Sequence, residues 1–233
     1  MIHQAFQCEF YFIRHGQSSS NASPEFAANI NFDTPLTDLG YAQARLLGER
    51  FKRDNVHFDR VYCSTLQRAI QTTETMLQAM GKSDGMFTQV DAIVEQRIPG
   101  WRGLLLTEVY TPEMVAYMRG KGSHFVPSDG ESYRMVQRRV ANWLEDEILY
   151  NAELVSEPQD LKIAIVGHGG ASRCLFHYIM GFDERFLWRI ALDNTSISRF
   201  RFSKEGWRLI CINDSAHLTH SPCRGESGIT TRG

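Results

Sequence analysis

Short apolar runs alternate with longer segments of helical periodicity along most of this 233-residue chain. The runs are typical of buried strands, because they are short, rich in aromatic and β-branched residues, and bounded by polar residues. They cover residues 10–14, 59–63, 162–166 and, more weakly, 86–90. Because parallel strands need long crossover connections, this alternation predicts an α/β fold. We expect a three-layer α/β/α sandwich with a mostly parallel sheet.

Helices are predicted between and after these strands. Thr37 is expected to cap the first helix and Ser64 the second, which should end at Gly81. Two further helices should cover residues 131–150 and 171–180. Helical spacing predicts the inward-facing side chains of the first three helices. These are Leu39, Ala42, Leu46 and Phe51 in the first; Leu66, Ala69, Ile70, Thr73 and Leu77 in the second; and Val136, Val140, Trp143, Leu144 and Ile148 in the third.

The C-terminal part of the chain has a different pattern. Residues 197–202 and 207–212 flank a short polar turn, which predicts a hairpin and therefore an antiparallel edge of the sheet. No internal repeat or linker divides the chain, so residues 1–220 are expected to form a single domain. Residues 221–233 are rich in Gly, Ser, Thr and Arg, and we expect them to form a mobile tail.

Composition argues against several functional classes. The formal net charge of −2 provides no basic excess for binding nucleic acid. No segment is long and apolar enough to suggest a signal peptide or a membrane span. The five cysteines form no Cys-x-x-Cys pair and mostly lie in or beside apolar runs, which favours free thiols in a reducing, cytoplasmic compartment. No pattern specifies an oligomeric state.

The first predicted strand ends in Arg14, His15 and Gly16. Ligands and catalytic groups in open α/β sheets gather at the carboxyl ends of strands. A guanidinium and an imidazole at such a position suit a nucleophile beside an anion clamp, and the glycine permits a sharp turn. Taken alone, the pair could equally be a surface arginine and histidine at a strand end.

Three motifs occur in a fixed order. Residues 14–21 follow the pattern Arg-His-Gly-x-Ser-x-x-Asn, residues 64–72 follow Ser-x-Leu-x-Arg-Ala-x-x-Thr, and residues 166–170 read Val-Gly-His-Gly-Gly. Together they resemble the signature of the histidine phosphatase superfamily, the phosphoglycerate mutase-like proteins, and the resemblance spans about residues 8–218. It implies phosphoryl transfer through a histidine.

The resemblance assigns roles to the motif residues. It implies that His15 is the nucleophile and becomes phosphohistidine during turnover. Arg14 and Arg68 would clamp the phosphate, since a guanidinium binds phosphate oxygens as a fork. His168 would stabilise charge on the transferring group as a hydrogen-bond donor, and the amides of Gly169 and Gly170 that follow it would suit an anion. A metal ligand or a buried structural histidine is the alternative reading of His168.

The proton donor is assigned to Glu95. Residues 95–103 resemble a weaker family stretch in which a glutamate precedes Gly-x-Trp-x-Gly. Here a proline takes the first glycine position and Arg102 replaces the usual glutamate, so the loop is expected to differ. Asp91 and Glu108 are the alternative carboxyls.

Further polar residues are candidates for the phosphate pocket. Asn21 matches the family's phosphate-contacting asparagine, Ser18 and Gln17 are expected to add hydrogen bonds, and Ser132 could line the pocket. No metal or other cofactor is required, because histidine and arginine supply the positive charge. No Gly-x-x-x-x-Gly-Lys phosphate loop is present, and the His-x-x-His sequence at 217–220 is interpreted as surface.

Residues 99–132 mix aromatic residues with glycine and proline. In the family, an insertion here covers the active site and shapes substrate choice. The analogy predicts a lid; an ordinary surface subdomain packed by its aromatic side chains is the alternative.

The favoured function is therefore a phosphatase that hydrolyses a small phosphate monoester, with a phosphoprotein as a further possible substrate. The first alternative is a cofactor-dependent phosphoglycerate mutase, although the insertion offers only Arg102, Arg119 and Lys121 for a substrate carboxylate. A second alternative is an inactive protein that only binds a phosphorylated ligand. A serine hydrolase is disfavoured because no Gly-x-Ser-x-Gly elbow is present.

Overall fold

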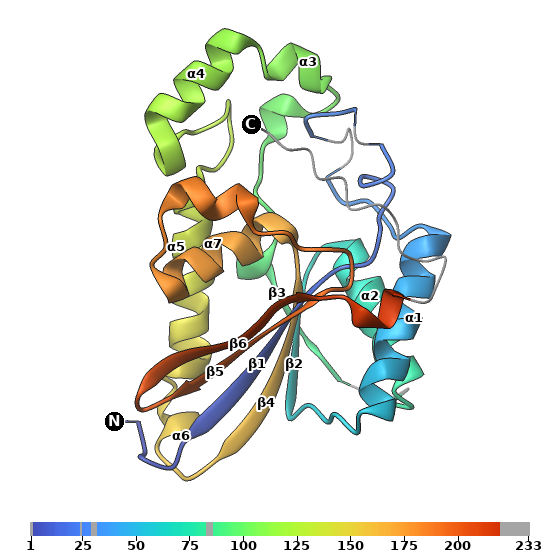
Figure 1. Ribbon diagram of the computed structural model, residues 1–233, viewed down its shortest axis with the longest axis vertical. Helices are drawn as coiled ribbons and strands as arrows, with labels where there is room; N and C mark the ends of the chain where they lie inside the picture. Colours follow the sequence, from blue (N-terminus) through green and yellow to red (C-terminus); the bar gives the residue numbers. More distant parts are fainter. Residues whose placement is uncertain (1, 24, 29–31, 83–85, 220–233) are drawn as a thin grey trace.

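The computed structural model describes residues 2–23, 25–28, 32–82 and 86–219. Within them, a six-stranded sheet has the order β3-β2-β4-β1-β5-β6 (Figure 1). The strands are β1 (Gln7–Arg14), β2 (Arg60–Ser64), β3 (Thr88–Val90), β4 (Asp160–Gly167), β5 (Ile197–Ser203) and β6 (Gly206–Asp214). Strands β3, β2, β4 and β1 are parallel, and β5 and β6 add an antiparallel edge. The expected α/β sandwich is confirmed.

Strand β1 is buried on both of its faces, as a central strand between two helical layers must be. Phe10 and Phe12 belong to one apolar core, while Tyr11 and Ile13 belong to the other. Helices α5 (Tyr133–Leu144) and α7 (Gly169–Met180) cover the first face, and α1 (Asp38–Arg53) and α2 (Gln67–Ala79) cover the second (Figure 1).

The buried stripe of α1 is shifted from the predicted one. Ala44, Leu47 and Phe51 are buried, whereas Leu39, Ala42 and Leu46 are only partly buried. The cause is the close packing of α1 on α2. A Cβ added to Gly48 would lie 2.3 Å from the Met76 carbonyl oxygen, so the small residues of α1 face α2. A pattern based on large apolar residues misses such a contact.

Several other boundaries also differ from the prediction. Leu66, not Ser64, is the N-cap of α2, and Ser64 ends β2. Ser132 caps α5 by accepting a hydrogen bond from the Met135 amide at 3.2 Å, so its hydroxyl serves the helix rather than the expected pocket. The predicted 131–150 helix is α5 followed by a π-helical turn at Glu145–Leu149.

The insertion, residues 99–132, lies beyond the carboxyl ends of the parallel strands (Figure 1). It contains α3 (Leu106–Val109), α4 (Pro112–Lys121) and 3₁₀ turns at Pro99–Trp101 and Gly122–His124. Trp101, Val109 and Phe125 form a small apolar cluster of their own, and no residue of α4 is buried. The insertion therefore lies at the carboxyl edge of the sheet, and its role as a lid stays a prediction.

The remaining short elements connect these layers. They are α6 (Ala152–Val155) and 3₁₀ turns at Asp91–Ile93, Glu184–Arg189 and Ala216–Leu218. Among the described residues, no helix is long and apolar enough to cross a membrane. The predicted tail, residues 221–233, lies outside the described residues.

Candidate active site

Two histidines meet at the carboxyl ends of neighbouring strands. His15 follows β1 and His168 follows β4, and these strands pair in parallel with Arg14 opposite Gly167. The two imidazole rings lie 5.1 Å apart between centroids and are tilted by 58°. Both are buried. The sheet register alone therefore brings together two residues far apart in sequence.

The hydrogen bonds of His15 define its tautomer. Its Nδ1 lies 2.6 Å from the Gly16 carbonyl oxygen, which can only accept, so Nδ1 carries the proton. The Arg68 Nε–H donates to His15 Nε2 at 3.2 Å, so Nε2 carries a lone pair. The nitrogen held beside the guanidinium is thus the one able to act as a nucleophile.

Arg68 reaches this site from the first turn of α2. It is 6% exposed, and its Nη1 also donates to the Phe32 carbonyl oxygen at 2.8 Å. The guanidinium groups of Arg68 and Arg102 each lie 5.9 Å from the centre of the Phe32 ring. Arg102 belongs to the insertion, so the Phe32 ring places a cation of the insertion near Arg68.

Two buried nitrogens near the histidines have no hydrogen-bond partner among the described residues. They are Arg14 Nε and His168 Nδ1. Arg14 Nη1 is held by the Leu192 carbonyl oxygen at 2.5 Å. Because a buried polar group without a partner is costly, a bound anion between these groups would remove the penalty.

Ser64 determines which His168 nitrogen remains free. The Ser64 hydroxyl lies 2.7 Å from His168 Nε2 and accepts a hydrogen bond from the Leu66 amide at 3.3 Å. With its oxygen accepting from Leu66, the hydroxyl hydrogen can be donated to Nε2. Nδ1 then carries the proton and is a free donor.

Burial and the neighbouring cations shift the ionisation of these groups. Burial, followed by the charges of Arg68 and Arg14, holds the pKa of His15 well below its usual value. Burial, followed by the charge of Arg68, does the same to the pKa of His168. Burial and then the charge of Arg173 lower the pKa of Arg14 to about 10. At neutral pH the site therefore combines neutral imidazoles with charged guanidinium groups.

Glu95 lies at the N-terminus of α7. Its carboxylate accepts the Gly170 amide at 2.9 Å and the Ala171 amide at 3.0 Å. A Cβ on Gly170 would lie 2.4 Å from Glu95 Oε1, so any side chain there would displace the carboxylate from this position. The amides of Gly169 and Gly170 were expected to suit an anion such as phosphate, but the Gly170 amide, together with that of Ala171, holds this carboxylate instead. The helix dipole favours the negative charge there.

The other predicted carboxyls have other partners. Asp91 pairs with Arg97 at 2.8 Å on the surface, and Glu108 accepts the Leu105 amide at 2.6 Å at the start of α3. Among the described residues, no cluster of three His, Cys, Asp or Glu side chains could hold a metal ion.

The predicted loop residues order the turn after β1. Asn21 Oδ1 accepts hydrogen bonds from the Ser18 amide at 3.1 Å and from Asn194 Nδ2 at 3.3 Å. The Gln17 side chain accepts from the Thr37 hydroxyl at 2.8 Å, so it points to the start of α1. Within the described residues, the side chains of Gln17, Ser18 and Asn21 form no hydrogen bond with His15, Arg68 or His168. Asn194 Nδ2 also donates to the His15 carbonyl oxygen at 2.9 Å.

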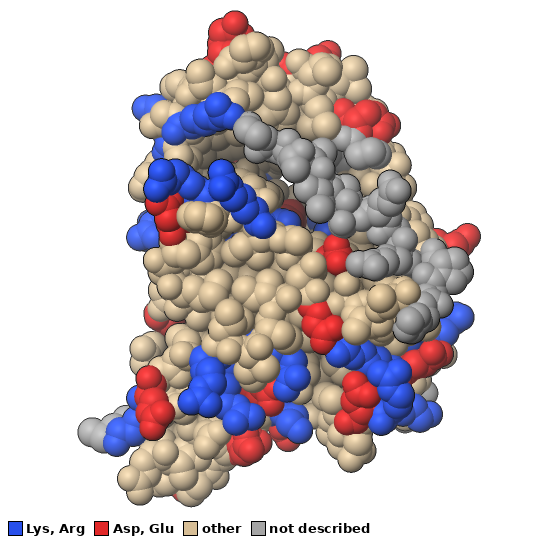
Figure 2. Space-filling model, viewed as in Figure 1, with Lys and Arg blue, Asp and Glu red and all other residues tan. Residues whose placement is uncertain are grey.

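Sequence reasoning did not select Arg173. A Cβ at Gly169 would lie 3.1 Å from Arg173 Nη1 and 3.5 Å from Arg14 Nε, so the two guanidinium groups flank one point beside the site. Arg173 Nε donates to the Ile190 carbonyl oxygen at 2.8 Å, and the guanidinium packs on Trp188. Its position in the sequence could have indicated it, because Arg173 follows Gly169 by four residues and so lies on the same face of the helix. Figure 2 shows Lys and Arg side chains along one rim of the hollow below the insertion.

Comparison with known proteins identifies the family. Residues 10–215 match the model of the histidine phosphatase superfamily (branch 1), and the chain therefore belongs to this superfamily. This confirms the expected family and enzyme class.

Individual relatives have different named activities. A Saccharomyces cerevisiae protein named Broad-specificity phosphatase is 28% identical over 211 residues, 89% of this chain and 86% of the relative. A protein of Bartonella tribocorum named 2,3-bisphosphoglycerate-dependent phosphoglycerate mutase is 32% identical over 177 residues, 73% of this chain and 81% of the relative. The solved structure of a phosphoserine phosphatase mutant from Entamoeba histolytica with phosphoserine has a TM-score of 0.73 at 21% identity. It covers 91% of this chain and 99% of that one, and shows the shared fold.

Proposed function

We propose that this protein is a phosphatase that hydrolyses a phosphate monoester through a phosphohistidine on His15. The observation that carries the proposal is the unprotonated His15 Nε2, held 3.2 Å from Arg68 Nε. Buried donors without partners lie beside it on Arg14 and His168. A tetrahedral anion bound among these groups would accept hydrogen bonds from the side chains of Arg14, Arg68 and His168.

In the first half-reaction, His15 Nε2 attacks phosphorus and the bond to the ester oxygen breaks. Arg14, Arg68 and the Nδ1–H of His168 stabilise the charge on the phosphoryl oxygens. Glu95 enters this step in its protonated form and gives its proton to the leaving oxygen, which leaves the carboxylate that accepts the Gly170 and Ala171 amides. The products are the alcohol, phosphohistidine and the Glu95 carboxylate.

In the second half-reaction, water attacks the phosphorus of phosphohistidine. The Glu95 carboxylate takes a proton from the water, and the phosphorus–nitrogen bond breaks. This releases inorganic phosphate and restores neutral His15 with protonated Glu95. Glu95 thus acts first as acid and then as base, as microscopic reversibility requires.

The insertion favours hydrolysis over mutase chemistry. A mutase must hold the carboxylate of its substrate while phosphate moves between hydroxyls. For such a carboxylate the insertion offers only three cationic side chains in its sequence, Arg102, Arg119 and Lys121. One of them, the Lys121 ammonium, lies 5.6 Å from the centre of the Tyr117 ring. The 32% identity to a phosphoglycerate mutase keeps that activity as the second candidate.

A small phosphorylated metabolite is the favoured substrate class, since the named activity of the Entamoeba histolytica protein is on phosphoserine. A phosphoprotein remains a second class. We also propose a reducing, cytoplasmic location, because Cys8, Cys63 and Cys174 are buried free thiols.

Trapping the intermediate tests the proposal. The protein is mixed with ³²P-labelled phosphate monoester and quenched in alkaline detergent, which preserves the phosphorus–nitrogen bond. We expect label on the wild type and none on His15→Ala, with free phosphate released by the wild type alone. Label on His15→Ala, or none on either protein during turnover, would contradict the mechanism.

A coupled assay separates the alternatives. Free-phosphate release is compared with conversion of 3-phosphoglycerate in the presence of its bisphosphate primer. A phosphatase releases phosphate much faster than it converts the phosphoglycerate, and a mutase does the reverse. A protein that binds these compounds but performs neither reaction is the inactive alternative.

A further inference from the structure

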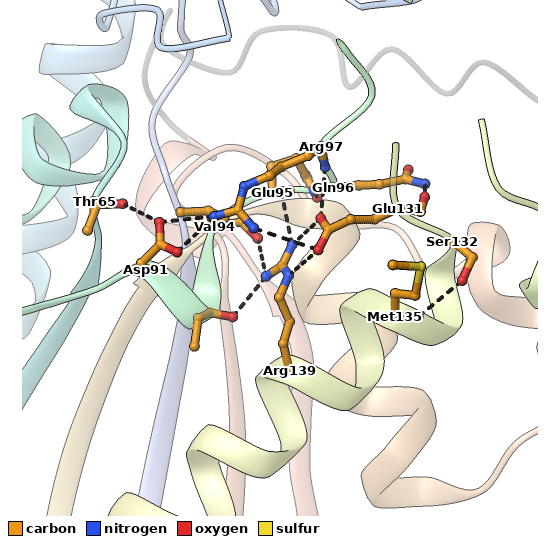
Figure 3. A network of polar contacts seen from close by, with 11 residues as sticks. Thr65, Asp91, Val94, Glu95, Gln96, Arg97, Glu131, Ser132, Met135 and Arg139 are labelled. Atoms are coloured by element: carbon orange, nitrogen blue, oxygen red, sulfur yellow. Dashed lines mark hydrogen bonds and ion pairs between the residues drawn. The ribbon is translucent and has the colours of Figure 1, made fainter. Parts of the chain in front are cut away.

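The segment that carries Glu95 is held by one guanidinium group. Arg139, on α5, donates from Nη1 to the carbonyl oxygens of Ala92 and Val94, both at 2.8 Å. Its Nη2 donates to the Glu95 carbonyl oxygen at 3.0 Å. Three backbone carbonyls next to the candidate acid therefore depend on a single side chain (Figure 3).

The same guanidinium is paired with Glu131. Arg139 Nε donates to Glu131 Oε1 at 2.8 Å, and Nη2 donates to Oε2 at 2.9 Å. All five N–H groups of Arg139 are thus used, and lysine, with three donors on a single nitrogen, cannot reproduce the arrangement. The two side chains are 16% and 14% exposed, so the pair is largely shielded from water.

Glu131 connects this pair to the chain just after Glu95. Its Oε2 accepts the Arg97 amide at 3.0 Å, and its own amide donates to the Arg97 carbonyl oxygen at 2.8 Å. Gln96 Nε2 donates to the Glu131 carbonyl oxygen at 2.6 Å. The segment is therefore fixed on both sides of Glu95, at the base of the insertion.

We propose that Arg139 and Glu131 are positioning residues for the proton donor, an inference that rests on the proposed function. Residues 95–97 belong to no helix or strand, so no regular hydrogen-bond pattern defines the path of the chain there. The Arg139–Glu131 pair fixes that path, and with it the distance from the Glu95 carboxylate to the leaving oxygen. A displacement of about 1 Å can cost about 10²-fold in rate.

The test uses two aryl esters of similar shape, phenyl phosphate and p-nitrophenyl phosphate. Phenol is the poorer leaving group and depends more on the acid. We expect Arg139→Lys to lower kcat/KM for phenyl phosphate by about 10- to 100-fold and for p-nitrophenyl phosphate by less than about 3-fold. Arg138→Lys, on the exposed neighbouring arginine, is the matched control and should change neither rate.

A double-mutant cycle with Glu95→Gln separates positioning from general loss of structure. Glu95→Gln should lower the phenyl phosphate rate by about 10²-fold, and adding Arg139→Lys should then lower it by less than about 3-fold. Equal losses on both esters, or full additivity with Glu95→Gln, would overturn the positioning role. If Glu95→Gln slows both esters equally, then Glu95 is not the acid and this inference fails, while the phosphohistidine on His15 is still tested separately by the trapping experiment.

Stability is checked in parallel by thermal unfolding. Glu131→Gln keeps one oxygen acceptor and is the milder variant should Arg139→Lys be too unstable to purify. We expect it to produce the same selective loss on phenyl phosphate, at about 3- to 10-fold. A loss that follows the fall in Tm and is equal for both esters would assign the pair a purely structural role.

Discussion

His15 and His168 reach the candidate site in one way and Glu95 in another. The histidines follow paired central strands, and the backbone register of β1 and β4 determines their separation. Glu95 lies on an irregular segment, whose path is determined by the side chains of α5 and by the amides of α7. The strand positions are built from repeated backbone hydrogen bonds, whereas the position of Glu95 depends on a few individual contacts.

Amino-acid substitutions should affect these two regions differently. A strand end tolerates changes in distant side chains, because the sheet still fixes it. The Glu95 segment and the insertion depend on specific residues, so changes there can alter leaving-group preference or access without disturbing the sheet. We therefore expect substitutions in the two regions to have different signatures.

The largest effect is expected on the histidine side, from Arg68→Lys. Lysine keeps the charge but loses the fork and the Nε donor to His15, so kcat/KM should fall by about 10²- to 10³-fold on both aryl esters. Steady-state kinetics measure this, with Arg45→Lys on the exposed face of α1 as control. A loss of less than tenfold would mean that charge, rather than geometry, is what the site requires.

The sequence predicts these two regions unequally. The strand ends at His15 and His168 follow from apolar runs, and the convergence of the two follows from parallel pairing. The contacts that hold the Glu95 segment cannot be predicted in this way. They come from Arg139, which is 44 residues further along the chain and gives the sequence around Glu95 no recognisable pattern. Ser64 was interpreted as a helix cap, since a serine before a helix is typical of one, but its hydroxyl serves His168.

The same limit explains the shifted stripe of α1. Gly48 allows a close approach of α1 to α2, and helical periodicity does not register a glycine as a contact residue. The fold class was predictable because it depends on the alternation of many residues. A single close contact such as that of Gly48 could not be predicted, because it depends on one residue and its distant neighbour.

The insertion should unfold separately from the sheet. Its small cluster includes Trp101, which is 8% exposed and packs on Tyr110 and Phe125. Trp101→Ala should cost about 3 kcal/mol locally and make the insertion more sensitive to limited proteolysis, with little change in the global Tm. Phe176→Ala, in the main core, should instead lower the Tm strongly. Equal falls in Tm for the two variants would show one cooperative unit.

A smaller effect is expected from Ser64→Ala. Without the hydroxyl, His168 Nε2 loses its partner and the free nitrogen is no longer fixed as a donor. We expect kcat to fall by about 10-fold, close to the free energy of one hydrogen bond. ¹⁵N NMR of the imidazole should find Nδ1 protonated in the wild type and a changed tautomer balance in the variant. Ser198→Ala, at another buried serine, should leave both measurements unchanged.

The smallest expected effect is a pH dependence of the free energy of unfolding, which the two histidines contribute and the insertion does not. His15 and His168 have pKa values held well below the ordinary 6.5, first by burial, whereas in the unfolded chain they titrate near 6.5. Below pH 6.5 the unfolded state therefore binds more protons, so stability is full above this pH and declines as the pH falls. The slope is at most about 1.4 kcal/mol per pH unit for each histidine.

Urea unfolding between pH 7 and pH 5 measures this slope, a range in which most carboxylates remain charged. His15→Asn should reduce the slope of the free energy of unfolding against pH by up to about 1.4 kcal/mol per pH unit. The double variant that also carries His168→Asn should reduce it by up to twice as much. Trp101→Ala should leave it unchanged, because the insertion contributes neither histidine. His217, whose pKa burial lowers to about 4, adds the same slope to every variant. A slope that becomes steeper when His15 is replaced would mean that the His15 imidazole is charged in the folded protein. In that case His15 could not present a lone pair to phosphorus at neutral pH.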